Sequence, residues 1–140
     1  MKKLLVFLSA AGLLAAQDAP SPPATARSRA LELAGAFAND GYKIRDGFWA
    51  GTLEAGKPQF LQVNLFSGNE YWFSAAALPP DVKMSVTLFD ENGRPLAEEV
   101  FQDGAAAAAG LVPDASGKYF VRVALLAGDK AGFCLVYSYK

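Results

Sequence analysis

The chain has 140 residues, of which 52% are hydrophobic and 19% are charged, and its formal net charge is −1. This length suits one domain with a real core, and the composition is that of a globular protein. The chain contains no histidine, which excludes Ser-His and Cys-His catalytic triads and histidine-ligated zinc or iron sites. Beyond Lys2 and Lys3 its basic residues are scattered singly, so no nucleic-acid partner is expected.

The N-terminal sequence MKKLLVFLSAAGLLAAQDAP has the layout of a secretory signal peptide. Lys2 and Lys3 precede an apolar run from Leu4 to Ala16, which is too short for a permanent membrane span. We expect residues 1–16 to be removed on export, which leaves a periplasmic or secreted protein without a membrane span. The sole cysteine, Cys134, has no partner for a disulfide within the chain and is interpreted as a small buried hydrophobe.

Two further segments are expected ahead of the sheet. Residues 17–26 are predicted to form a flexible spacer, since prolines and small residues favour an extended tether. Residues 27–41 are predicted to hold a helix from about Ser28 to Asn39, with Ser28 as its N-cap and Gly41 just past its end. Its apolar stripe, at helical spacing, consists of Ala30, Leu33, Ala34 and Phe37.

From Tyr42 onward the apolar period changes from 3.6 to 2, which predicts half-buried strands separated by turn residues. Residues 42–140 are therefore predicted to form an antiparallel β-sandwich of seven to eight strands, so that the chain is mainly β with one short N-terminal α-helix. The residues expected to face the core are Leu61, Val63 and Leu65, then Val82, Met84, Val86 and Leu88, then Tyr119, Val121, Val123 and Leu125, and finally Phe133, Leu135, Tyr137 and Tyr139.

Two stretches of this region need separate predictions. The five alanines from Ala105 to Ala109 would suit a helix, but Gly104 and Gly110 bracket them. We therefore expect a small-residue strand or a crossover there, because tertiary context overrides the weak helix preference of alanine. The polar stretch SGNE, from Ser67 to Glu70, is predicted to be a β-turn between adjacent strands.

The segment FDENGRP is the strongest metal candidate in the sequence. Asp90, Glu91 and Asn92 offer three oxygen-bearing side chains in succession, whereas Ca²⁺ takes six to eight oxygens. The same residues suit a tight hairpin, because Asn92-Gly93 can supply the positive φ angles of a two-residue turn. The turn is the favoured interpretation, and a calcium site completed by other loops is the alternative.

The densest acidic spot, Glu98-Glu99, does not predict catalysis. Adjacent residues on a strand point to opposite faces, so these two carboxylates cannot act as an acid and base pair, and a solvated strand edge is favoured. No serine–lysine motif and no glycine-rich phosphate loop occurs. The chain is therefore predicted not to be an enzyme, and no cofactor other than calcium is expected.

The order of strands and turns from about Gly51 to Tyr139 resembles the bacterial pre-peptidase C-terminal domain. This resemblance implies a jelly-roll-like β-sandwich, usually attached to secreted hydrolases, that binds or stabilises and is not itself catalytic. The residues that carry the resemblance are Leu53, Gly68, Tyr71, Phe73, Leu88, Asp90, Asn92, Gly93, Gly117, Tyr119, Val121, Arg122 and Val123.

Trp72 is the candidate for ligand contact. Tyr71 and Phe73 match inward positions of the resemblance, and strand alternation then sends Trp72 outward. An outward tryptophan is either a platform on which a sugar or peptide stacks, or a side chain covered by the N-terminal helix or by neighbouring loops. The covered interpretation is favoured, because the apolar stripe of the helix needs a surface to lie on.

Together these features predict an exported, non-catalytic β-sandwich module with a binding or structural role. Its partner is expected to be a protein or a glycan, and the module is expected to be a monomer. The alternative is an accessory or inhibitor of a secreted hydrolase that acts through exposed loops.

Overall fold

The computed structural model describes residues 22–36, 38–45, 47–96 and 99–140. The predicted signal peptide, the first part of the predicted spacer, Phe37 and Glu98 lie outside these residues. Within them, no helix is both long enough and apolar enough to cross a membrane.

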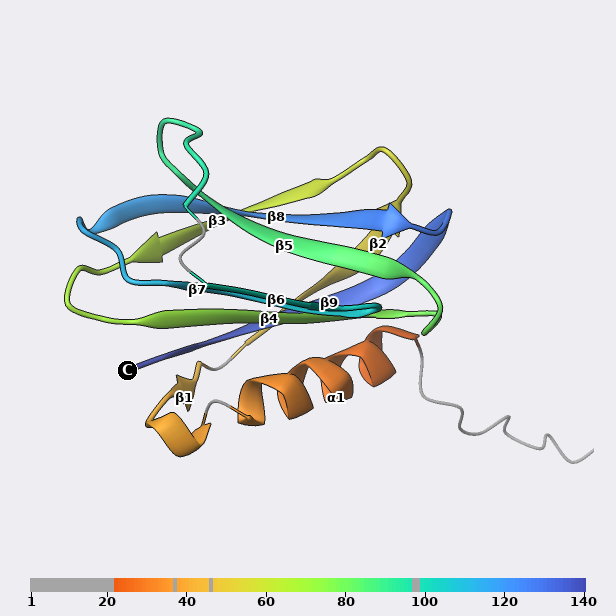
Figure 1. Ribbon diagram of the computed structural model, residues 1–140, viewed down its shortest axis with the longest axis horizontal. Coiled ribbons are helices and arrows are strands. Elements are labelled where there is room, and N and C mark those ends of the chain that lie inside the picture. Colours follow the sequence, from red (N-terminus) through yellow and green to blue (C-terminus); the bar gives the residue numbers. More distant parts are fainter. Residues whose placement is uncertain (1–21, 37, 46, 97–98) are drawn as a thin grey trace, which may run out of the picture.

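The described chain forms one α-helix, one short 3-10 helix and nine strands in the order shown in Figure 1. The elements are α1 (Pro22–Gly35), η1 (Ala38–Asp40), β1 (Lys43–Ile44), β2 (Trp49–Glu54), β3 (Gln59–Leu65), β4 (Tyr71–Leu78), β5 (Lys83–Asp90), β6 (Glu99–Asp103), β7 (Ala106–Leu111), β8 (Gly117–Ala127) and β9 (Lys130–Tyr139).

The strands form two antiparallel sheets that pack face to face as a β-sandwich. One sheet has the order β1-β9-β4-β7-β6, with β2 also paired to β9, and the other has the order β3-β8-β5. In Figure 1 the three-stranded sheet lies above the six-stranded sheet, and α1 lies below it as a third layer. The prediction of a mainly β sandwich with one N-terminal helix is confirmed. The described residues form nine strands, more than the seven to eight predicted, because β1 and β2 are separate strands that pair with different parts of β9.

Period-2 alternation places the expected side chains in the core between the sheets. In β5, Met84, Val86 and Leu88 are buried while the residues between them are partly exposed, which is the pattern of a strand with one face inward. Most of the other residues predicted to face the core are buried or pack against it. Tyr139 is an exception and is exposed, because it is the last residue of β9.

The helix begins earlier than predicted. It starts at Pro22, so residues 22–26, which were assigned to the spacer, are helical, and it ends at Gly35. Proline is tolerated in the first turn, where its missing N–H has no helical partner to lose. Ser28 is not a cap but lies inside the helix, where its hydroxyl donates to the carbonyl of Ala24 at 3.3 Å. Gly41 has a positive φ of 90°, but it follows η1.

The helix packs on the six-stranded sheet through small side chains. Its stripe of Ala26, Ala30 and Ala34 is fully buried, and Ala30 and Ala34 were predicted. The stripe contacts Ala76 of β4 and Cys134 and Val136 of β9. Cys134 is thus a buried small hydrophobe, as predicted, and burial raises the pKa of its thiol.

The alanine-rich stretch forms strand β7, in the interior of the six-stranded sheet. It makes a hairpin with β6 through Gly104, whose φ of +58° lies in the left-handed region that favours glycine. Strand β6 lies at the edge of the sheet, and all five of its residues, Glu99 included, are exposed. The prediction of a strand at Ala105 to Ala109 is therefore confirmed for Ala106 onward.

Candidate functional site

The outer face of the three-stranded sheet carries a pocket lined by aromatic rings and one arginine. Phe60 comes from β3, Phe89 from β5, and Phe120 and Arg122 from β8. Each alternates with core residues along its strand, so each side chain points away from the core. We call these four residues the Phe–Arg pocket, and its volume is roughly 320 Å³.

Strand register brings these side chains together from distant parts of the sequence. Phe60 lies opposite Arg122 in the β3–β8 pair, and Phe89 lies opposite Phe120 in the β5–β8 pair. The ring centroids of Phe60 and Phe89 are 6.3 Å apart, with the rings tilted by 53°. Phe60 is 57% exposed, so a large apolar surface remains open to solvent in this pocket.

The guanidinium of Arg122 contacts neighbouring side chains of the sheet, but it forms no ion pair with the described residues. It lies 5.3 Å from the centre of the Phe89 ring, and its Nη2 donates to the Thr87 hydroxyl at the long distance of 3.5 Å. Its Nε is buried without a hydrogen-bond partner among the described residues. Neither ion pair found within the described part of the chain includes Arg122.

The rim of the pocket is formed by the hairpin after β5, which contains the three calcium candidates. Oδ1 of Asp90 accepts hydrogen bonds from the backbone N–H groups of Asn92 and Arg94, each at 2.9 Å. The N–H of Gly93, with φ +79°, donates to the carbonyl of Asp90 at 3.1 Å. Asp90 thus stabilises its own turn, whereas Glu91 and Asn92 are exposed. The described residues contain no cluster of three or more acidic or cysteine side chains placed to hold a metal ion.

A second cleft lies between two loops at the same end of the molecule. Its volume is roughly 460 Å³, and residues 90–96 form one wall while residues 111–119 form the other. The hydroxyl of Tyr119 donates to the carbonyl of Ala115 at 2.6 Å and so holds the second loop in place. Asp90, Glu91 and Asn92 line this cleft, and Glu91 also lines the Phe–Arg pocket.

Trp72 is buried on the helix side of the six-stranded sheet. It is 9% exposed and lies on the same face of β4 as Ala76, which packs under α1. It is in register with Gly110 of β7, and a hydrogen bond links it to Tyr42. This position fits the covered interpretation that the sequence favoured, and the indole does not contribute to the Phe–Arg pocket.

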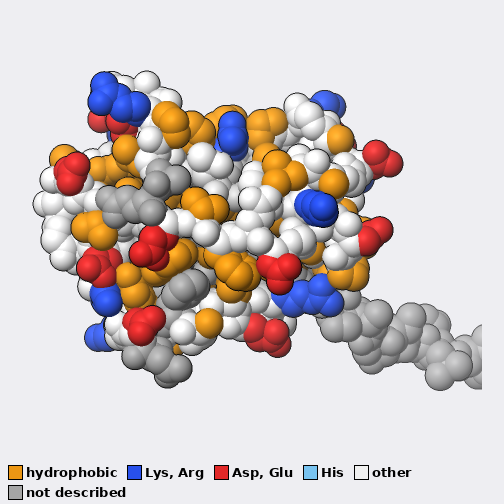
Figure 2. Space-filling view, viewed as in Figure 1, with side chains coloured by type: hydrophobic (Ala, Val, Ile, Leu, Met, Phe, Trp, Pro, Cys, Tyr) orange, Lys and Arg blue, Asp and Glu red, His pale blue; other side chains and the backbone are white. Residues whose placement is uncertain are grey.

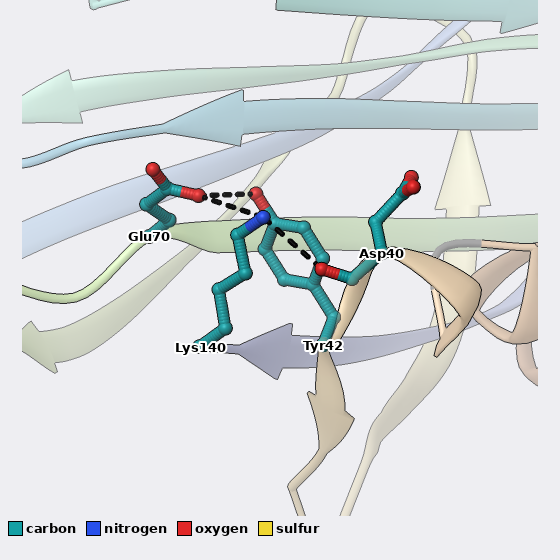
Figure 3. A network of polar contacts seen from close by, with 4 residues as sticks. All are labelled: Asp40, Tyr42, Glu70 and Lys140. Atoms are coloured by element: carbon teal, nitrogen blue, oxygen red, sulfur yellow. Dashed lines mark hydrogen bonds and ion pairs between the residues drawn. The ribbon is translucent and has the colours of Figure 1, made fainter.

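A network of polar contacts joins Asp40, Tyr42, Glu70 and Lys140, as Figure 3 shows. The hydroxyl of Tyr42 donates to Oε2 of Glu70 at 3.0 Å, and Nζ of Lys140 lies 3.3 Å from the same oxygen. Nζ also donates to the backbone carbonyl of Asp40 at 3.1 Å. Burial, with the added effect of the hydrogen bond and charge of Glu70, raises the pKa of Tyr42 to about 12. The network joins η1 to the start of β4 and to the last residue of the chain.

Glu70 also ends the SGNE stretch, which forms a turn as predicted. The N–H of Asn69 donates to the carbonyl of Phe66 at 3.3 Å, and Gly68 has a φ of +94°. The turn does not join neighbouring strands of one sheet, however. It leads from β3 in one sheet to β4 in the other, so the prediction was wrong on this point, because pairing between strands cannot be read from their order in the chain.

Arg122 stands between the predicted core residues Val121 and Val123, so alternation places it on the outer face, but the sequence analysis did not identify the pocket. Phe60, Phe89 and Phe120 each stand beside a predicted core residue, so alternation alone places all three on the outer face. That signal was present in the sequence. Their convergence depends on the order β3-β8-β5 and its register, which join residues far apart in the chain.

The fold and the pocket together define a β-sandwich protein with a ligand-sized, aromatic pocket on the outer face of one sheet. No model of a known protein family matches the chain, and no curated protein matches its sequence. Acidic and basic side chains are interspersed with apolar ones over the face drawn in Figure 2.

Proposed function

We propose that the protein is an exported, non-catalytic β-sandwich module that binds a ligand through the Phe–Arg pocket. The observation that carries the proposal is the convergence of Phe60, Phe89 and Phe120 around Arg122 on an open sheet face. Pockets lined mainly by aromatic groups with a few polar ones are typical of small-ligand sites. Phenyl rings bury large areas when they stack on a sugar ring or on another side chain, so a glycan or a protein segment is the expected ligand.

Export is supported by the N-terminal sequence, and the resemblance to the pre-peptidase C-terminal domain fits a secreted module with jelly-roll-like topology. We expect the exported protein to begin at Gln17, in the periplasm or outside the cell, and to be a monomer. Intact-mass measurement of the exported product tests the cleavage. Recovery of the full-length chain in the membrane fraction would contradict it.

Binding is tested by probing glycan and peptide arrays with the wild-type protein and two variants. Phe60→Ala removes the most exposed ring of the pocket and should abolish retention on the ligand that the wild type binds. Phe66→Ala is the matched control, because Phe66 is 56% exposed but lies outside the Phe–Arg pocket, just after β3. Equal retention of wild type and Phe60→Ala on every ligand would contradict the proposed site.

A second candidate function is an accessory or inhibitor of a secreted hydrolase. The cleft between residues 90–96 and 111–119 favours it, because exposed loops at one end of a sandwich offer an adaptable binding surface. A hydrolase gene beside this one would supply the partner for testing. In that assay, Lys118→Glu in the cleft wall should change hydrolase activity, whereas Phe60→Ala should not.

A further inference from the structure

We infer that the ligand of the Phe–Arg pocket carries a carboxylate attached to a ring. The ring would stack on Phe60 and its neighbours, and the carboxylate would bind the guanidinium of Arg122. This inference rests on the proposed function and specifies the chemical class of the ligand.

The case for a carboxylate comes from the hydrogen-bonding state of Arg122. A guanidinium has five N–H donors, but in the described structure Arg122 makes one long hydrogen bond and has no ion pair. The side chain is partly buried among phenyl rings, where a cation without a counter-ion is costly. A carboxylate matches the planar fork of arginine with two parallel hydrogen bonds and would neutralise the charge.

The case for a ring comes from the shape of the pocket. Three phenyl side chains surround Arg122, and the rings of Phe60 and Phe89 lie within the range of aromatic contacts at 6.3 Å. A volume of roughly 320 Å³ is at the small end of ligand sites, which suits one ring better than a long chain. A uronic acid of a polysaccharide and an aromatic carboxylic acid share this chemistry.

The charged residue on the rim opposes such a ligand and provides a sharp test. Glu91 lines the same pocket as Arg122 but makes no ion pair with it. Its carboxylate therefore repels an incoming anion without neutralising the guanidinium. Removing this charge should strengthen the binding of an acidic ligand and leave a neutral ligand unaffected.

The experiment measures binding of two matched pairs of probes to the full exported chain by calorimetry. The pairs are digalacturonate with galactobiose, and 3-phenylpropionate with 3-phenylpropanol. We expect the Kd of one acidic probe to be at least about tenfold lower than that of its neutral partner, because the neutral partner lacks a charge-assisted hydrogen bond. The pair that shows the preference distinguishes a sugar acid from an aromatic acid.

Three variants assign the preference to the pocket. Arg122→Gln should abolish it, and Arg122→Lys, which keeps the charge but not the planar fork, should retain part of it. Glu91→Gln should tighten binding of the acidic probe about two- to fourfold, as expected for an exposed charge. Asp103→Asn is the control for Glu91→Gln, because it removes an exposed carboxylate from strand β6 of the other sheet. Thermal unfolding of each variant shows that it is folded.

The outcomes separate the inference from the proposed function. Neutral probes that bind as tightly as their acidic partners, in a manner that depends on Phe60, overturn the carboxylate and leave the binding function standing. Binding of none of the four probes at millimolar concentration also overturns the inference. If an array ligand binds equally to wild type, Phe60→Ala and Arg122→Gln, both the inference and the proposed site are wrong.

Discussion

The indole ring of Trp72 lies directly against Gly110, the residue opposite it on β7. A methyl group at Gly110 would come within 3.1 Å of two ring carbons, Cε2 and Cζ2. Gly110→Ala should therefore lower the free energy of unfolding by about 1–3 kcal/mol, because the buried ring has to move. Chemical denaturation measures the change. Gly35→Ala is the control, since nothing lies within 4 Å of its added methyl group, and it should not destabilise the fold.

The burial of Trp72 predicts weak quenching of its fluorescence by iodide. Trp49→Phe has to be made first, so that the signal belongs to Trp72 alone. This variant keeps an aromatic ring against Tyr137, with which Trp49 stacks at a centroid distance of 5.6 Å. Strong quenching in the single-tryptophan variant would show that the indole is open to solvent.

Cys134 reports on the contact between α1 and the sheet. Its thiol is buried beneath the alanine stripe and has a raised pKa, so the folded protein should react slowly with Ellman's reagent. Ala30→Leu adds three carbons to a fully buried helix position and should speed labelling by loosening this contact. Glu32→Leu places the same side chain on the exposed face of the helix and should leave the rate unchanged. Equal rates in both variants would mean that the helix does not control access to Cys134.

Tyr42 should make stability fall at alkaline pH. Its pKa in the folded protein is about 12, above the ordinary value of 10, so folding favours the protonated hydroxyl. The resulting stabilisation is fully present below pH 10 and is lost as the pH rises from 10 through 12. Tyr42→Phe should lower stability at neutral pH by about 1 kcal/mol through loss of the hydrogen bond to Glu70. The difference from the wild type should shrink between pH 10 and 12, and a constant difference across this range would contradict the assignment.

Asp90 is expected to stabilise the turn that follows it and not to bind a metal ion. Asp90→Ala removes the acceptor of two backbone hydrogen bonds and should cost about 1–2 kcal/mol. Asp90→Asn keeps one carbonyl oxygen as an acceptor and should be milder, and Glu91→Ala serves as an exposed control. Thermal unfolding of the wild type should not shift when EDTA is added. A lower midpoint in EDTA would show that calcium is structural.

The core strands could be predicted because their signal is local. In β5 the alternation of Met84, Val86 and Leu88 is enough to identify the buried face, and the same holds for β3 and β8. The start of α1 could not be read in this way, because Pro22 and Pro23 favour a spacer as much as a first helical turn. The helix packs on the six-stranded sheet through Ala26, Ala30 and Ala34, and this packing cannot be read from the local sequence around Pro22.

The Phe–Arg pocket, in contrast to the core strands, could not be predicted from the local sequence. Each of its phenylalanines has a predictable direction, yet nothing local to Phe60 indicates that Arg122 will lie opposite it. That relationship arises only when β8 pairs with β3, and the pairing of β8 with β5 then adds Phe89. Trp72, the ligand candidate predicted from the sequence, is by contrast buried on the helix side of the six-stranded sheet.

The exposed edge strand β6 affects whether the protein self-associates at high concentration. Two copies joined edge to edge as antiparallel strands about Phe101 would bring Glu99 of each copy opposite Asp103 of the other. Like charges so placed repel, and this protects an otherwise open row of hydrogen-bonding groups. The protection is lost at high ionic strength, where salt screens exposed charges. Concentrated stocks should therefore remain clear in low salt and become turbid when salt is added.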